Sequence, residues 1–138
     1  MKYLPDKIRD EVWQRASNCC EYCLLHRNTV FFTHEIDHII SSKHKGTDAL
    51  LNLALACYYC NRNKGSDIGS LYKGELIRFF NPRIDVWQVH FQLDLDTAII
   101  RPISPIGEVT AAIFGFNQID RIIERQILIA SNKYPPSF

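Results

Sequence analysis

The stretch His34-Glu35-Ile36-Asp37-His38-Ile39-Ile40 places a carboxylate beside an imidazole in a run that is otherwise typical of a short β-strand. Successive side chains of a strand point to opposite faces, so Asp37 is expected to share a face with Glu35, and His38 with Ile36. If both polar side chains act on one group, the strand must end, twist sharply or bulge at this point. The sequence predicts such a break at Asp37 and His38.

Length and composition set the broad class of the chain. It has 138 residues, of which 46% are hydrophobic and 22% charged, as in a soluble protein of one domain. The formal net charge is +1, so any nucleic-acid surface is expected to be a local patch rather than a property of the whole protein. We see no apolar run long enough for a membrane span and no leader-like segment, and we expect a cytoplasmic location.

Four of the five cysteines form two CxxC pairs, Cys20 with Cys23 and Cys57 with Cys60. Tetrahedral Zn²⁺ takes four thiolates, and a CxxC turn presents two of them to one centre. The alternatives are free thiols or a redox pair, and the presence of two pairs favours zinc. Four sulfur ligands leave no open position, so the predicted zinc site is structural. Cys19 is expected not to be a ligand.

Polar residues after the first CxxC pair follow a recognisable order: Asp37-His38, then Asn52, then Asn61 directly after Cys60. With the cysteines, this order resembles the HNH endonuclease family in its Asp-His/Asn/Asn variant with zinc cysteines, over about residues 8–68. The residues that carry the resemblance are Cys20, Cys23, Glu35, Asp37, His38, Ile39, Asn52, Leu53, Cys57, Cys60, Asn61 and Lys64.

The resemblance implies an α+β fold whose core is the ββα-metal motif, a two-stranded hairpin followed by a helix with one divalent ion between them. It implies that Asp37 and Asn61 hold Mg²⁺ or Mn²⁺ and that His38 is the general base. Asn52 is implied to fix the hairpin loop and to orient the catalytic histidine. Many family members carry a further histidine where this sequence has Gly65, so two protein ligands and a modest metal affinity are expected.

The chemistry of these residue types agrees with the implied roles. Side-chain oxygens suit Mg²⁺, which also takes phosphate oxygens as ligands, and a neutral imidazole accepts a proton from water. The expected function is hydrolysis of DNA phosphodiester bonds. The alternatives are a non-catalytic, zinc-stabilised nucleic-acid-binding module within a larger complex, or a structural protein with nicking as a partial task. Taken alone, Asn52 is also compatible with a turn residue and Asn61 with a helix N-cap.

Basic residues flank the expected site and are candidates for phosphate contacts, although surface lysines are often only solvated. These candidates are Lys43, Lys45, Arg62 and Lys64. DNA is the expected partner, and the oligomeric state is open between a monomer and a weak homodimer. Glu35 is assigned no role, and the remaining histidines are expected to be structural or merely exposed.

Hydrophobic periodicity and turn residues predict the remaining elements. The N-terminal half is expected to hold a helix after Pro5, strands over 29–32, 35–40 and 53–57, and a helix from Asn61 to Gly65. The C-terminal half is expected to hold a helix over 71–80, a hairpin of strands 86–95 and 98–103, and two final helices, the second capped by Asn117.

Two parts of one compact domain are expected: residues 1–74 as the zinc-stabilised nuclease core and residues 75–138 as an extension packed on it. Residues 79–91 resemble a tail that follows the core in some bacterial family members. The simplest interpretation is that the hairpin and final helices complete the core. The alternative is a second DNA contact through Arg83 or Arg101, or a dimer surface.

Overall fold

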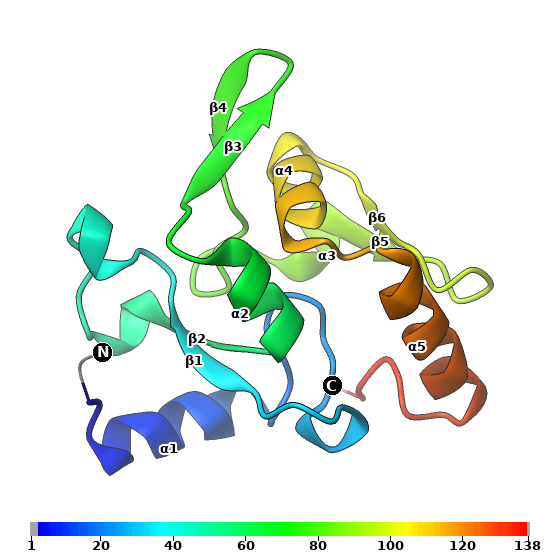
Figure 1. Ribbon diagram of the computed structural model, residues 1–138, viewed down its shortest axis with the longest axis horizontal. Helices are drawn as coiled ribbons and strands as arrows, with labels where there is room; N and C mark the ends of the chain where they lie inside the picture. The colour runs from blue at the N-terminus through cyan, green and yellow to red at the C-terminus, as the bar shows by residue number, and fades with distance from the viewer. Residues whose placement is uncertain (1–2, 138) are drawn as a thin grey trace.

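The computed structural model describes residues 3–137, which form helices and small antiparallel sheets, an α+β arrangement (Figure 1). Helix α1 (Asp6–Arg15) begins directly after Pro5, as predicted. Its Val12 is fully buried against Leu53 and Leu55. Among the described residues, no helix is long and apolar enough to cross a membrane.

The central element is an antiparallel pair of strands, β1 (Glu35–His38) and β2 (Leu53–Ala56). Every residue of β2 is buried, which explains its unbroken apolar sequence. Helix α2 (Tyr58–Lys64) follows at once and packs on both strands. The strand predicted over 29–32 is wrong, because a short 3-10 helix, η1 (Arg27–Thr29), leads there into irregular chain.

The predicted break in the first stretch is found as a strand end. The four residues of β1 pair one to one with β2, so no bulge interrupts the strand. After His38, Ile39 N still donates to Asn52 O at 2.8 Å in the register of the ladder, and at Ile40 a side chain replaces the partner strand's backbone: Ile40 N donates to Asn52 Oδ1 at 2.9 Å. The connection to β2 contains two 3-10 turns, η2 (Ser42–His44) and η3 (Leu50–Asn52).

Helix α2 begins three residues before the predicted start at Asn61. The sulfur of Cys57, its N-cap residue, accepts a hydrogen bond from Cys60 N at 3.4 Å, so the second CxxC turn is itself the first turn of the helix. Gly65 ends the helix at a φ of 54°, in the region of positive φ that favours glycine.

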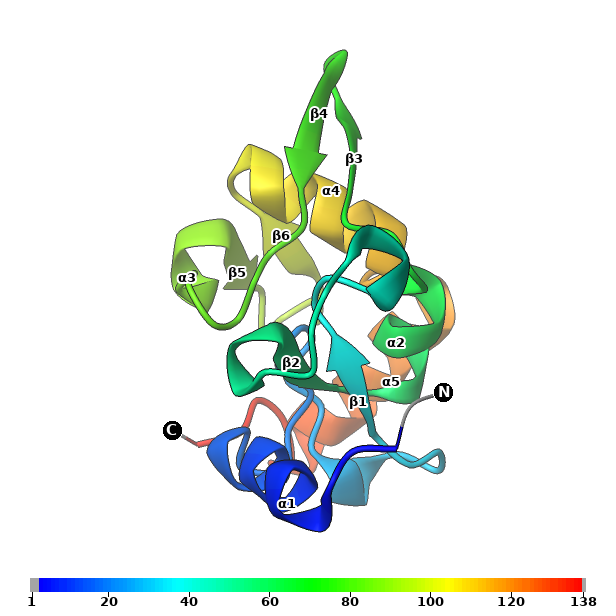
Figure 2. The same ribbon diagram turned by 90° about the vertical axis from the view of Figure 1, so that its left-hand side faces the viewer.

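The helix predicted over 71–80 is wrong. The chain instead forms a hairpin of β3 (Gly69–Tyr72) and β4 (Glu75–Arg78), which projects from the body of the molecule (Figure 2). The two residues between the strands, Lys73 and Gly74, both have positive φ, at 50° and 80°. Such a two-residue turn matches the twist of the flanking strands and closes a tight hairpin.

The C-terminal half contains a short helix, a second hairpin and two longer helices. These elements are α3 (Trp87–His90), β5 (Phe91–Leu93), β6 (Ile100–Pro102), α4 (Pro105–Phe114) and α5 (Ile119–Ala130). Strands β5 and β6 pair antiparallel. The first part of the strand predicted over 86–95 is wrong, because α3 occupies it.

The predicted cap of the last helix is wrong. The N-cap residue of α5 is Gln118, which makes no side-chain cap. The Asn117 side chain instead accepts from Ile100 N at 2.9 Å and donates to Ile100 O at 2.8 Å. It therefore satisfies one backbone residue of β6 and ties that strand to the start of α5.

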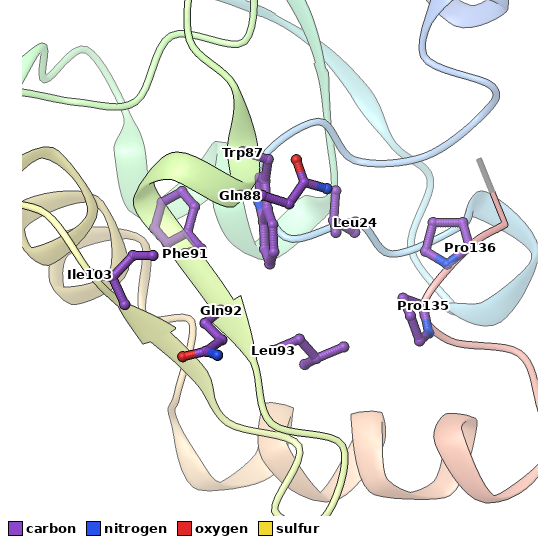
Figure 3. Close-up of a pocket in the computed structure, with 9 residues that line it drawn as sticks. All are labelled: Leu24, Trp87, Gln88, Phe91, Gln92, Leu93, Ile103, Pro135 and Pro136. Atoms are coloured by element: carbon purple, nitrogen blue, oxygen red, sulfur yellow. The ribbon is translucent and has the colours of Figure 1, made fainter.

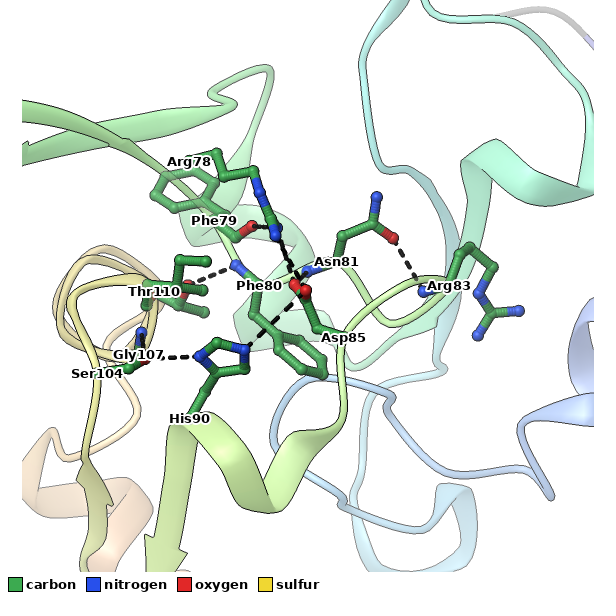
Figure 4. Close-up of polar contacts among 11 residues, drawn as sticks. Arg78, Phe79, Phe80, Asn81, Arg83, Asp85, His90, Ser104, Gly107 and Thr110 are labelled. Atoms are coloured by element: carbon green, nitrogen blue, oxygen red, sulfur yellow. Dashed lines mark hydrogen bonds and ion pairs between the residues drawn. The ribbon is translucent and has the colours of Figure 1, made fainter.

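Residues 79–91 form a polar network between the end of β4 and the start of α4 (Figure 4). Asp85 accepts two hydrogen bonds from Arg78, at 2.8 and 2.9 Å, and one from Asn81 N at 2.8 Å. The Arg78 guanidinium holds the pKa of Asp85 below its ordinary value. His90 Nδ1 lies 2.6 Å from Ser104 Oγ, which also caps α4.

The main hydrophobic core draws on both halves of the chain, with Tyr22 and Ala54 from one and Phe79 and Phe114 from the other. Trp87 Nε1 donates to Tyr22 O at 2.8 Å across this core. The expected division between residues 74 and 75 falls in the turn between β3 and β4, and it stays a prediction.

Arg83 and Arg101, the two arginines considered for a second DNA contact, each have an acidic partner. Arg83 pairs with Glu21, and both side chains are largely buried. Arg101 Nη2 lies 2.7 Å from Asp94 Oδ2 on a more exposed surface.

Candidate functional site

The four cysteines of the two CxxC pairs meet in one buried cluster. Their sulfur atoms all lie within 4.8 Å of one another, and each residue is fully buried. Four sulfurs at this spacing fit the ligand set of a tetrahedral zinc ion. Cys19 is not part of the cluster, and its sulfur lies 3.5 Å from Ser17 O. The arrangement is compatible with the predicted CxxC zinc site.

Helix α5 contributes an arginine to this cluster. Arg121 Nη2 donates to Cys60 Sγ at 3.3 Å, and Nη1 donates to Phe114 O at 2.7 Å. The side chain is only 3% exposed. Burial works to lower the pKa of Arg121, but the attraction of the nearby sulfurs, above all that of Cys60, raises it. A buried cation therefore lies against the sulfurs of Cys57 and Cys60, and no local sequence pattern predicts it.

A cavity of about 560 Å³ lies beside β1 and the middle of α2. Asp37 and His38 line it from the strand, and Asn61 lines it from the helix. Glu35 lines it as well. Asp37, His38 and Asn61, which come from two separate segments of the sequence and were predicted to form one site, thus line the same cavity.

Asp37 is buried beside two hydrogen-bond donors. Tyr22 Oη donates to Asp37 Oδ2 at 2.7 Å, and Lys64 Nζ lies 3.2 Å from Oδ1. Burial raises the pKa of Asp37, while Lys64 and Tyr22 act to lower it. Since Tyr22 lies between Cys20 and Cys23, the first CxxC turn directly contacts this carboxylate.

Lys64 is not placed as a surface phosphate contact would be. It is 2% exposed, and its ammonium group donates to His38 O at 2.9 Å as well as to Asp37. The other three basic candidates, Lys43, Lys45 and Arg62, are exposed. The guanidinium carbon of Arg62 lies 5.5 Å from the centre of the Tyr58 ring.

His38 is held by a carboxylate that the sequence analysis missed. His38 Nε2 lies 2.8 Å from Asp48 Oδ1. An ionised carboxylate can only accept, so Nε2 carries the hydrogen and Nδ1 is the nitrogen that can accept a proton. The only local indication of this role was the place of Asp48 in the polar loop between the two strands.

Asn52 closes the loop that carries Asp48. Its side-chain nitrogen donates to Ile40 O at 2.9 Å and to Thr47 O at 2.8 Å, and its oxygen accepts from Ile40 N. Gly46 packs against the same point, where an added Cβ would lie 1.6 Å from Ile40 O. Asn52 therefore ties the two ends of the loop together, and only glycine fits beside it.

Asn61 projects from α2 toward the start of β1. Its Nδ2 donates to Glu35 Oε2 at 2.6 Å, so the amide plane is set by an acidic partner on the strand. An asparagine binds a hard cation through its oxygen, and this contact engages the nitrogen end. Glu35, to which the sequence analysis gave no role, is thus the residue that orients Asn61.

Comparison with protein families identifies this region. Residues 20–67 match the family model of the HNH endonucleases. The match contains both CxxC pairs and the residues of the cavity from β1 and α2, so the resemblance seen in the sequence is confirmed over this segment. Neither the curated proteins nor the solved structures gave a match to the chain.

A second cavity, of about 500 Å³, lies outside the HNH segment except at Leu24 (Figure 3). Trp87 and Phe91 line one side, and Pro135 and Pro136 line the other. None of the residues that line it is titratable, so it offers no acid, base or charged ligand.

Proposed function

We propose that the protein is a metal-dependent endonuclease that hydrolyses DNA phosphodiester bonds at the cavity of the HNH segment. The observation that carries the proposal is the placement of Asp37, His38 and Asn61 in one cavity. These three side chains offer a carboxylate, an imidazole and an amide, which are the groups that metal-assisted hydrolysis needs.

Asp37 and Asn61 would hold the ion. Their oxygen atoms are the ligand type that Mg²⁺ and Mn²⁺ take. A carboxylate has about four lone-pair positions, so the donors Tyr22 and Lys64 leave capacity on Asp37 for a cation. When bound, the ion supplies positive charge to the phosphate and to the leaving oxygen.

His38 would accept a proton from the attacking water at Nδ1. Asp48 holds the opposite ring nitrogen, which sets the tautomer and balances the charge of the imidazolium that forms. Asn52 acts indirectly, since it fixes the loop on which Asp48 stands. By family likeness, the products are 5′-phosphate and 3′-hydroxyl ends.

The sulfur cluster would hold a structural Zn²⁺, because four protein sulfurs leave no position for substrate. In this proposal, residues 1–74 form the nuclease core and residues 75–138 an extension that completes it. Lys43, Lys45 and Arg62 are proposed to contact DNA phosphates. Lys64 is proposed to support Asp37 and His38 from within the core instead.

The test is cleavage of supercoiled plasmid with Mg²⁺, with Mn²⁺ and with EDTA. Cleavage is expected only with metal, and His38→Ala is expected to lower the rate by roughly 10²–10⁴-fold, the usual contribution of a general base. His44→Ala, a change to an exposed histidine in the adjoining loop, is the matched control and should cut like the wild type. If folded His38→Ala protein cuts at the wild-type rate, the proposal is wrong.

One contact favours a second candidate, a non-catalytic nucleic-acid-binding module. The Lys64 ammonium already supplies a positive charge beside Asp37 Oδ1, and this charge opposes the binding of a cation. A module of this kind would bind DNA, show no metal-dependent cleavage, and give the same affinity for DNA with Mg²⁺ as with EDTA.

A further inference from the structure

Two neighbouring phenylalanines are exposed beside the cavity. Phe31 is 95% exposed and Phe32 is 45% exposed. They lie on the segment between η1 and β1, directly before Thr33, which lines the cavity. A phenylalanine exposed to this extent adds almost nothing to the core, so its position calls for another explanation.

Together with Tyr58 of α2, the two phenylalanine rings form a row of three aromatic side chains. The ring centres of Phe32 and Tyr58 are 4.3 Å apart and the planes are tilted by 22°, which is a stacked pair. Phe31 meets Phe32 edge-on, with ring centres 5.4 Å apart. We call Phe31, Phe32 and Tyr58 the aromatic row. It ends at Arg62, whose guanidinium lies over Tyr58.

The row is continuous with the proposed catalytic residues. Asn61 lines the cavity, and the next residue, Arg62, contacts the last ring of the row. Thr33, the residue after the middle ring Phe32, lines the cavity as well. Aromatic faces beside a cation match the chemistry of a nucleic-acid strand, in which flat bases alternate with charged phosphates.

We propose that the aromatic row stacks on unpaired bases of a DNA strand next to the scissile phosphate, so that the substrate is single-stranded or locally unpaired DNA. The link to a scissile phosphate rests on the proposed nuclease function. Inside a duplex, neighbouring pairs cover both faces of each base, so a protruding ring finds a partner only where a base is unstacked. Stacking of this type carries little sequence preference.

The experiment measures binding of labelled oligonucleotides by fluorescence anisotropy with His38→Ala protein, in which cleavage is suppressed. The substrates are a single strand, the same strand with abasic sites, and a blunt duplex. In this background, Phe31→Ala is expected to weaken single-strand binding about tenfold, the effect of losing one stacked base. Phe31→Tyr, which keeps a ring, should bind as the parent does.

Leu76→Ala is the matched control, since Leu76 is 77% exposed on the β3–β4 hairpin, and it should leave binding unchanged. On the abasic strand, Phe31→Ala and its parent should bind equally. The inference is overturned if Phe31→Ala binds the normal strand as its parent does, or loses as much on the abasic strand. It is also overturned if the parent prefers duplex, or if Phe31→Ala abolishes a dimer in sedimentation, which would assign the row to a second copy.

The two proposals fail separately. If the wild-type protein never cuts DNA but its single-strand binding depends on Phe31, the nuclease proposal falls and the stacking surface stands. If the protein cuts DNA and Phe31→Ala leaves single-strand binding and cleavage unchanged, the stacking surface falls and the nuclease stands.

Discussion

Tyr22 links the sulfur cluster to the cavity through a single side chain. It is fully buried, it packs edge-on against Phe114, and its hydroxyl donates to Asp37 Oδ2 at 2.7 Å. Burial, together with the negative charge of Asp37, raises the pKa of Tyr22, so the hydroxyl stays a donor at neutral pH. Asp37 is therefore oriented by a residue that lies inside the first CxxC turn.

Tyr22→Phe removes this donor and keeps the packing of the ring. Without it the Asp37 carboxylate can rotate, so we expect the Mg²⁺ concentration for half-maximal cleavage to rise by roughly tenfold, as is typical when an outer-sphere partner of a metal ligand is lost. Stability should fall by about 2 kcal/mol, the value of a hydrogen bond to a charged group. Cleavage rates across a Mg²⁺ titration and thermal unfolding measure the two effects.

Tyr134→Phe is the control for this change. Its hydroxyl is also buried and donates to Cys23 O at 2.7 Å, but it does not contact Asp37. A loss of stability of about 1 kcal/mol is expected, since the acceptor is an uncharged carbonyl, with no change in the Mg²⁺ requirement. Equal shifts of the Mg²⁺ midpoint in both variants would show that Tyr22 acts only through general stability.

At this scale, motif order predicted that Asp37, His38 and Asn61 lie together, as they do in the cavity, but it did not predict all of their partners. His38 and Asn61 follow from motif order, because a motif preserves spacing along the chain. The burial of Lys64 does not follow, since lysine is almost always exposed and only the fold places its ammonium group beside Asp37. Asp48 and Glu35 were missed for the same reason: each acts through one tertiary contact.

At the scale of elements, the β3–β4 hairpin shows how a pattern can mislead. A helix was predicted over 71–80 because Asn81-Pro82 after the apolar residues is typical of a helix end, and the residues of the hairpin are mostly exposed, so burial did not select a strand period. The decisive feature was the pair Lys73-Gly74, whose positive φ angles suit a two-residue turn. Helices α1 and α5 were predicted because their apolar faces are sustained over several turns.

Helix α5 is tied to the sulfur cluster by Arg121, and this contact predicts a kinetic effect on zinc. Four thiolates around Zn²⁺ carry a net negative charge, and a buried charge needs a partner. Arg121→Gln removes the cation, so we expect zinc to transfer to a chromogenic chelator about 10–100-fold faster, the usual range for an outer-sphere contact. The absorbance of the zinc–chelator complex, recorded over time, measures the transfer rate.

Arg125→Gln is the matched control on the same helix. Arg125 is 1% exposed and donates to Ala98 O and Phe116 O at 2.8 and 2.7 Å. Both variants lose a buried guanidinium and should unfold at lower temperature. Only Arg121→Gln should release zinc faster while still folded, and equal release rates would assign the effect to stability alone.

At the scale of the whole molecule, segments that are far apart in the sequence contact one another around the sulfur cluster. Arg121 reaches it from α5, Tyr134 binds the backbone of Cys23 from the C-terminal tail, and Trp87 binds the backbone of Tyr22. The clustering of the two CxxC pairs was predictable from the sequence, because this spacing of cysteines is typical of zinc ligands. The contacts from residues 75–138 were not, because each is a single long-range hydrogen bond with no local pattern.

This arrangement predicts that zinc is needed for the folding of the whole chain and not only of the HNH segment. Cys57→Ser removes one ligand, and we expect it to abolish zinc binding and the cooperative unfolding transition of the entire chain, since metal binding and folding are coupled. Cys19→Ser is the control: Cys19 is also buried but lies outside the cluster, so it should keep one zinc per chain. Zinc content by atomic absorption and thermal unfolding by circular dichroism separate the two variants.

A Cys57→Ser protein in which the C-terminal helices still melt cooperatively would show that residues 75–138 fold without the metal centre. The long-range contacts to Cys23, Tyr22 and Cys60 would then be a consequence of folding rather than a cause.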